Sequence, residues 1–227
     1  KTNMIIATLK EILPGENRVA LIPPSVKDLI KAGLTVQIES GSGIESNFSD
    51  KDYEDAGATI TNASNIYQNA DIIVKVATPT LDEIGQMKSG SIFTSFFQTT
   101  KELEAVKAMT DKKVTGFSMH LIPRTTLAQK MDALSSQANI AGYKAVLMAA
   151  SQLGIYMPLL MTAAGTIRPA KILILGAGVA GLQAIATAKR LGAQVEAFDV
   201  RPIVKEQVES LGAKFIEVES SSDDGVG

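Results

Sequence analysis

Residues 171–199 read KILILGAGVAGLQAIATAKRLGAQVEAFD, an apolar run followed by three spaced glycines and a closing acid. In this pattern Gly176 permits a tight turn, Gly178 lets a pyrophosphate approach the backbone, and Gly181 allows close helix packing. The helix that follows points its free amides and the positive end of its dipole at the phosphates. We therefore expect a dinucleotide to bind here, with Val179 beside its adenosine half.

The closing acid, Asp199, lies 18 residues beyond Gly181 at the end of a second apolar run. A carboxylate at this point accepts hydrogen bonds from both ribose hydroxyls and repels a 2′-phosphate, so the sequence favours NAD over NADP. Val200 and Arg201 follow directly and are expected to line the same adenosine half. Arg201 is a counter-signal, because an arginine in this place can bind a 2′-phosphate.

Composition excludes several other classes of function. The chain carries 22 basic and 24 acidic side chains, so its net charge of −2 gives no support for nucleic-acid binding. It has no cysteine, and its single histidine, His120, makes neither a catalytic triad nor a metal cluster. We therefore expect no metal and no nucleic acid, and the first residues show no signal peptide.

Strand-like and helix-like segments alternate along the whole chain, which predicts an α/β fold with two Rossmann-like parallel-sheet domains flanking a cleft. Strands are expected at residues 4–8, 35–39, 72–76, 91–97, 114–118, 172–175, 195–198 and 214–218. Helices are expected at residues 23–32, 50–56, 62–68, 101–109 and 134–153, and after the glycine turn. Residues 145–167 carry no charge, but their polar residues and proline favour a buried helix and a loop over a membrane span.

We expect three segments: an N-terminal α/β domain at residues 1–133, an interdomain helix and linker at 134–165, and a dinucleotide-binding domain at 166–227. The linker helix carries small residues suited to close packing, namely Ala138, Ala141, Gly142 and Ala145. A dinucleotide-binding fold has two halves and six strands. Residues 166–227 supply strands for one half, so we expect the second domain to be truncated in this chain.

The chain resembles the NAD(H)-binding component, domain I of the alpha subunit, of proton-translocating NAD(P) transhydrogenase, and more distantly alanine dehydrogenase. The resemblance rests on KEILPGENRVALIP near the N-terminus, on IESG at residues 38–41, and on GAGVAGLQAIATAKRLGA. The segment RTTLAQKMD distinguishes the two, because Arg124, Gln129 and Asp132 reproduce the transhydrogenase pattern. Leu127 departs from it, since a basic residue is expected there.

The resemblance implies that residues 124–135 lie over the nicotinamide ring. Arg124, Gln129 and Asp132 are then catalytic and cofactor-binding, and Ser135 joins Gln129 in hydrogen bonding the carboxamide or ribose. Hydride transfer between two nicotinamides moves no proton, so it requires closely held rings and exclusion of water. Arg124 and Asp132 can pair to fix the loop; the alternative is a surface ion pair worth at most about 1 kcal/mol.

The resemblance also implies partners. Hydride passes from NADH on this component to NADP(H) held on a separate NADP-binding domain, and a membrane-spanning domain of the same enzyme couples this step to proton translocation. A homodimer is implied, placed at the membrane surface on the cytoplasmic side of a bacterium or the matrix side of a mitochondrion.

Two alternatives stay open. The first is an alanine-dehydrogenase-like amino-acid oxidoreductase, whose catalytic histidine is expected where this chain has Phe97, a residue that cannot exchange a proton. The substrate-binding residues of that family are matched by Arg18 and Lys75, which we interpret as inherited structure. The second alternative is a nucleotide sensor without catalytic activity.

Overall fold

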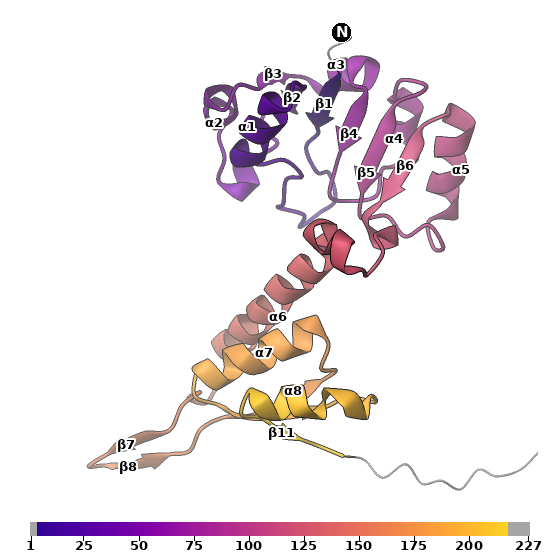
Figure 1. Cartoon of the computed structure of the whole chain (residues 1–227). Coiled ribbons are helices and arrows are strands. Elements are labelled where there is room, and N and C mark those ends of the chain that lie inside the picture. The colour runs from indigo at the N-terminus through magenta and orange to yellow at the C-terminus, as the bar shows by residue number, and fades with distance from the viewer. Residues whose placement is uncertain (1–3, 218–227) are drawn as a thin grey trace, which may run out of the picture. The chain divides into compact units, whose positions relative to one another are not determined.

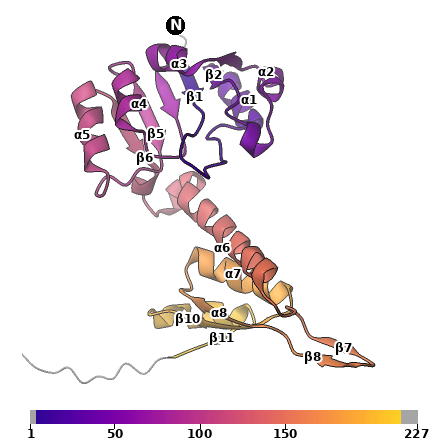
Figure 2. The same ribbon diagram turned by 180° about the vertical axis from the view of Figure 1, so that it is seen from behind.

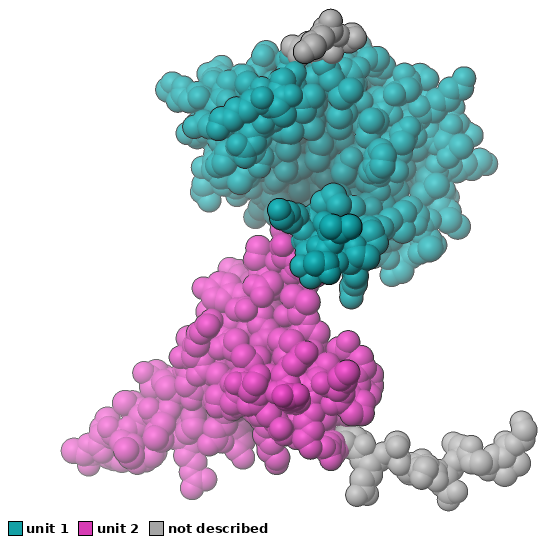
Figure 3. All heavy atoms as spheres, in the orientation of Figure 1, with its two compact units in different colours: residues 1–131 teal, residues 132–227 magenta. Residues whose placement is uncertain are grey.

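The computed structural model describes residues 4–217 and divides the chain into two compact units, Lys1–Met131 and Asp132–Gly227 (Figure 3). Each unit is built on a parallel sheet with helices between its strands (Figure 1). The predicted α/β class with two Rossmann-like parallel sheets is therefore confirmed. The three-segment division, the separate linker and the cleft stay predictions.

Unit 1 contains a six-stranded parallel sheet in the order β3-β2-β1-β4-β5-β6. The order reverses between β1 and β4, and ligands of open α/β sheets bind at such a switch point. The strands are β1 (Ile5–Thr8), β2 (Thr35–Glu39), β3 (Thr59–Thr61), β4 (Ile72–Val74), β5 (Ile92–Ser95) and β6 (Thr115–Ser118). The helices are α1 (Pro23–Lys31), α2 (Asp50–Asp55), α3 (Ala63–Asn69), α4 (Leu81–Gln86) and α5 (Leu103–Lys112).

Two hydrophobic clusters cover the two faces of this sheet, because successive strand residues point to opposite sides. In β1, Ile6 packs with α1 and α2, whereas Ala7 packs with α3, α4 and α5. The sequence analysis missed β3 and α4, which are three and six residues long. All the other strands and α-helices of unit 1 form where they were predicted, within a few residues at their ends.

The side chain of Phe97, the residue expected to replace the histidine of an alanine dehydrogenase, lies inside the fold. Its side chain is buried in the cluster beneath α5, so no substrate reaches it. A phenylalanine also cannot exchange a proton, so the chemical objection to the amino-acid dehydrogenase remains.

Unit 2 contains a three-stranded parallel sheet in the order β11-β10-β9 and a two-stranded antiparallel hairpin, β7 with β8. Its elements are α6 (Ala133–Gln152), β7 (Leu160–Thr162), β8 (Gly165–Ile167), β9 (Lys171–Leu175), α7 (Val179–Arg190), β10 (Gln194–Phe198), α8 (Lys205–Ser210) and β11 (Lys214–Phe215). The hairpin occupies part of a predicted loop. Of the strand predicted at residues 214–218, Lys214–Phe215 forms, and Val218 lies outside the described residues.

Helices α6 and α7 lie side by side in both views (Figure 2). A Cβ atom at Gly142 of α6 would lie 2.1 Å from the carbonyl oxygen of Ala180 in α7. Only glycine fits at such a distance, so Gly142 permits a close contact between α6 and α7 inside unit 2. Below this contact, Ile185 and Ala188 of α7 pack on Val195 of β10 to form the core of the unit.

Among residues 4–217, no helix has both the length and the apolar character needed to cross a bilayer.

Candidate functional site

The glycine turn joins β9 to α7 as the sequence predicts, and its three glycines have different surroundings. Gly176 has a φ of +94°, a conformation that side chains rarely adopt. A Cβ at Gly181 would lie 1.8 Å from the carbonyl oxygen of Gly176, so the first turn of α7 packs directly on the turn backbone. A Cβ at Gly178 would meet no atom within 4 Å. The fold therefore needs two of these glycines and leaves open space at the third.

Gly178 is the N-cap of α7 and supplies no capping side chain. The first amides of an α-helix have no partner within the helix, and they carry the positive end of its dipole. Val179, the first residue of α7, is partly exposed beside them. The start of α7 is therefore suited to an anion that approaches over Gly178.

Asp199, at the end of β10, accepts four hydrogen bonds. Oδ2 accepts from the amide of Ala177 at 2.7 Å and from Nη2 of Arg201 at 3.0 Å. Oδ1 accepts from the amide of Arg201 at 2.8 Å and from its Nε at 3.0 Å. A carboxylate has about four acceptor sites, so Asp199 is fully engaged and ties the glycine turn of β9 to the end of β10.

Electrostatics keep this carboxylate charged. Hydrogen bonds from the Arg201 side chain and from the amide of Ala177 hold the pKa of Asp199 well below its usual range. The same contact raises the pKa of Arg201. Asp199 is therefore an ionised acceptor at neutral pH, with a side chain that is 6% exposed, whereas the side chain of Arg201 is 57% exposed.

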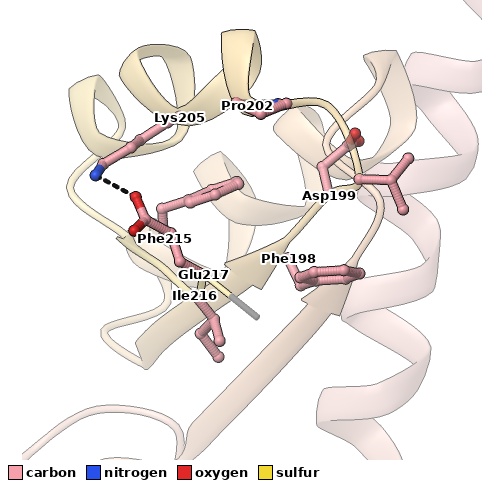
Figure 4. A pocket seen from close by; sticks show the side chains of 8 residues that line it. Phe198, Asp199, Pro202, Lys205, Phe215, Ile216 and Glu217 are labelled. Atoms are coloured by element: carbon pink, nitrogen blue, oxygen red, sulfur yellow. Dashed lines mark hydrogen bonds and ion pairs between the residues drawn. The ribbon is translucent and has the colours of Figure 1, made fainter. Parts of the chain in front are cut away.

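A cavity of about 510 Å³ opens beside Asp199 at the carboxyl ends of β10 and β11 (Figure 4). Lys205 of α8 and Glu217 form an ion pair of 2.5 Å, which raises the pKa of Lys205 and lowers that of Glu217. The cavity is lined by Phe198, Asp199, Val200, Pro202, Lys205, Phe215, Ile216 and Glu217. Apolar walls beside an ionised acceptor suit a flat organic group that carries hydroxyls.

The sequence analysis missed the residues beyond Arg201 in this cavity. A usable signal existed, because residues that follow neighbouring parallel strands meet at one edge of the sheet. Phe215 and the two residues after it stand in that relation to Asp199. A smaller hollow of about 370 Å³ is lined by Leu175, Gly176, Phe198, Asp199, Val200 and Arg201, so the structure brings four predicted site residues of unit 2 to one edge.

The predicted nicotinamide segment begins on the surface of unit 1. Arg124 and Gln129 are exposed, and Gln129 lies on a short 3-10 helix, η3 (Thr126–Met131). Ala128 is the buried residue of η3 and anchors it. Leu127, which departs from the transhydrogenase pattern, is 93% exposed. The exposed residues of this segment are free to meet a ligand or partner.

The segment ends in unit 2, where Asp132 is the N-cap of α6. Its carboxylate accepts hydrogen bonds from the Ser135 amide at 3.0 Å and from Ser135 Oγ at 2.6 Å. Two predicted site residues are thus joined in one cap. The ion pair of Asp132 with Arg124, and the meeting of this segment with the glycine turn, stay predictions.

The switch point of unit 1 is filled by side chains of the chain itself. Nζ of Lys75, which follows β4, lies 2.5 Å from Glu83 Oε1 and 3.9 Å from Glu11 Oε2. Glu11 also accepts hydrogen bonds from the amides of Val76 at 2.6 Å and Ala77 at 3.2 Å. The side chains of Lys75, Glu11 and Glu83 are nearly inaccessible, which supports the interpretation of Lys75 as structural. Arg18 contacts Glu16 at 2.6 Å in the loop that follows β1.

Comparison with known sequences places both units in one family. Residues 7–141 match the family described as alanine dehydrogenase/PNT, N-terminal domain, and residues 145–226 match its C-terminal domain. The NAD(P) transhydrogenase subunit alpha of Haemophilus influenzae is 46% identical over 99% of this chain and 44% of that protein. The chain spans 42% to 59% of the length of the curated transhydrogenase alpha subunits that it matches.

Solved structures give the same relation. A transhydrogenase from Sinorhizobium meliloti has a TM-score of 0.91 at 50% identity, over 94% of this chain and 64% of that one. An L-alanine dehydrogenase has a TM-score of 0.81 at 28% identity, over 93% of this chain and 60% of that one. The chain is thus similar to both kinds of protein and more similar to the transhydrogenase.

Proposed function

The chain belongs to the alanine dehydrogenase/PNT family, and we propose that it is the NAD(H)-binding component of a proton-translocating NAD(P) transhydrogenase. In this role it holds NADH while a hydride passes directly to NADP⁺ on a partner domain. The greater identity to transhydrogenase subunits than to alanine dehydrogenases, 46% against 33%, supports this choice within the family.

The observation that carries the proposal is the edge of unit 2 where the glycine turn meets Asp199. We assign the pyrophosphate to the open space over Gly178 and the start of α7, and the ribose hydroxyls to Asp199. Val200 and the cavity that it lines take the adenosine half, together with Val179 at the start of α7. Each part of the ligand then faces a group of matching chemistry: amides, a carboxylate and an apolar wall.

The nicotinamide belongs with residues 124–135 in this proposal. Arg124 and Gln129 are exposed and supply hydrogen-bond donors, while Asp132 and Ser135 fix the start of α6. Their task is to hold the ring and exclude water, because a hydride moves between nicotinamides without a proton. No general acid or base is assigned.

The whole enzyme supplies the remaining parts. An NADP-binding domain holds NADP(H), and a membrane-spanning domain couples hydride transfer to proton translocation. This component acts as a homodimer at the membrane surface, facing the cytoplasm of a bacterium or the matrix of a mitochondrion.

Hydride exchange with an added NADP-binding domain tests the proposal. Asp132→Asn is the informative variant, because asparagine caps a helix as well as aspartate does and leaves the start of α6 intact. We expect it to slow hydride exchange far more than it weakens NADH binding measured by fluorescence. Equal losses in rate and binding would show that the segment only shapes the site.

A second assay decides against the amino-acid dehydrogenase. Phe97 cannot exchange the proton that oxidative deamination requires. We therefore expect no substantial oxidation of NADH with pyruvate and ammonia. A substantial rate in that assay, or NADH binding without any hydride exchange, would overturn the transhydrogenase proposal in favour of the dehydrogenase or of a nucleotide sensor.

A further inference from the structure

Arg201 covers the carboxylate that the proposed site needs. Its Nε and Nη2 atoms each lie 3.0 Å from an oxygen of Asp199, one on Oδ1 and one on Oδ2. The 2′- and 3′-hydroxyls of a ribose would require these same two oxygens. An arginine side chain therefore occupies both positions that the ribose must take.

This cover differs from the other contacts of Asp199 in how easily it is removed. The amides of Ala177 and Arg201 belong to the backbone and donate to the carboxylate at 2.7 and 2.8 Å. The guanidinium belongs to a side chain that is more than half exposed and reaches solvent freely. It can leave while the two amides keep the carboxylate in place.

We propose that Arg201 sets how strongly the site prefers NADH over NADPH. Its side chain is a removable cover on Asp199, and its positive charge offsets the carboxylate, which limits the rejection of a 2′-phosphate. The inference rests on the proposed NAD(H) site and deepens it. When NAD(H) binds, the ribose hydroxyls replace Nε and Nη2 on the two oxygens. When NADP(H) is offered, the displaced guanidinium lies where it can pair with the 2′-phosphate.

Charge decides the expected effect of substitution. In Arg201→Ala the carboxylate stands uncovered and unpaired, so it repels a 2′-phosphate more strongly and receives ribose hydroxyls without displacing a partner. In Asp199→Asn the repulsion disappears and the arginine stays available to a phosphate. The two substitutions should therefore move specificity in opposite directions.

The test measures dissociation constants of NADH and NADPH by fluorescence titration of the full-length protein. We expect Arg201→Ala to raise the preference for NADH over NADPH by about tenfold, and Asp199→Asn to lower it by at least as much. Arg190→Ala removes the same charge at the exposed end of α7, about 18 Å from the glycine turn, and should leave the preference unchanged.

Each outcome discriminates. If NADH binds to the wild type but Arg201→Ala keeps the wild-type preference, the proposal for Arg201 is wrong and the NAD(H) site stands. If Arg201→Ala weakens NADH and NADPH equally, Arg201 only supports the local structure. If the wild type binds neither nucleotide, the proposed NAD(H) site fails together with this inference.

Discussion

In unit 1 the carboxylate of Glu11 follows β1 and accepts hydrogen bonds from the amides of Val76 and Ala77, which follow the neighbouring strand β4. In unit 2 the carboxylate of Asp199 follows β10 and accepts one from the amide of Ala177, which follows the neighbouring strand β9. Both units thus hold an acid across the carboxyl ends of two parallel strands, the edge at which such sheets bind ligands.

The two carboxylates differ in what covers them. Glu11 lies beside the Lys75–Glu83 ion pair inside the fold. If Lys75 moved away, both carboxylates would be buried without a cation. Asp199 lies under one exposed arginine and beside an open cavity. The same backbone arrangement therefore acts as a structural joint in unit 1 and is available to a ligand in unit 2.

Among the substitutions considered, we expect replacement of the buried Lys75 to lower the free energy of unfolding most. Lys75→Met leaves Glu11 and Glu83 buried without a cation, so we expect a loss of about 3–5 kcal/mol in the free energy of unfolding, measured with urea. Lys88→Met is the matched control, because Lys88 pairs with Asp71 on the surface. Such an exposed ion pair contributes about 0–1 kcal/mol to the free energy of unfolding. Equal losses in the two variants would contradict the assignment of Lys75 to a structural joint.

Unit 2 is held by close backbone contact instead of buried charge. Gly142→Ala places a Cβ 2.1 Å from the carbonyl oxygen of Ala180, so α6 and α7 must separate. We expect a loss of about 1–3 kcal/mol in thermal or urea unfolding, the usual range for overpacking. Gly154→Ala, where a Cβ meets no atom within 4 Å, should change stability by less than about 0.5 kcal/mol. A similar small effect at Gly142 would mean that the helices are not in contact.

Titration sharpens the comparison further, because the pKa of Glu11 is raised and the pKa of Asp199 is lowered. Burial raises the pKa of Glu11, although the amides of Val76 and Ala77 and the charge of Lys75 oppose it and Glu16 adds to it. The folded protein therefore binds this proton more tightly than the unfolded chain. The stability it contributes is complete below the unfolded pKa and declines as the pH rises through the raised pKa.

Glu11→Gln should remove this decline. We expect the difference in unfolding free energy between the wild type and Glu11→Gln to change as the pH rises through the raised pKa of Glu11, and to be constant at higher pH. The measurement is urea unfolding at a series of pH values. Asp199→Asn should instead show its change in acid, because the pKa of Asp199 is lowered and its contribution disappears as the pH falls. The reverse pattern would contradict these assignments.

The sequence predicted the parts of the site that depend on local backbone geometry. Gly176 and Gly181 were assigned a turn and a close approach, and the structure has a positive φ at one and a 1.8 Å distance for a Cβ at the other. Asp199 was recognised because its distance along the chain from the turn is short. The α4 helix was also predictable, since Thr80 and Glu83 form a capping box whose spacing is visible in the sequence.

Partners that lie far apart in the chain were not predictable. Glu11 and Val76 are 65 residues apart, and no periodicity or spacing indicates that their strands are neighbours at a switch point. Lys75 was singled out, but its partners were not. The β7–β8 hairpin was missed because each strand has three residues, too few for alternation to stand out. The relation of residues 124–135 to the glycine turn also joins parts that lie far apart in the chain, and it stays a prediction.

The smallest expected effect on stability belongs to Gly178, the point at which unit 2 leaves room for a ligand. Its backbone is extended, with a φ of −80°, and a Cβ would meet no atom within 4 Å, so Gly178→Ala should fold with unchanged stability. We expect the same methyl group to weaken NADH binding at least about tenfold, because it enters the space assigned to the pyrophosphate. Gly181→Ala is the contrasting control, since its clash with Gly176 should lower both stability and binding. NADH affinity unchanged in a fully folded Gly178→Ala would show that the pyrophosphate lies elsewhere, and the edge of unit 2 would then be a closed joint like that of unit 1.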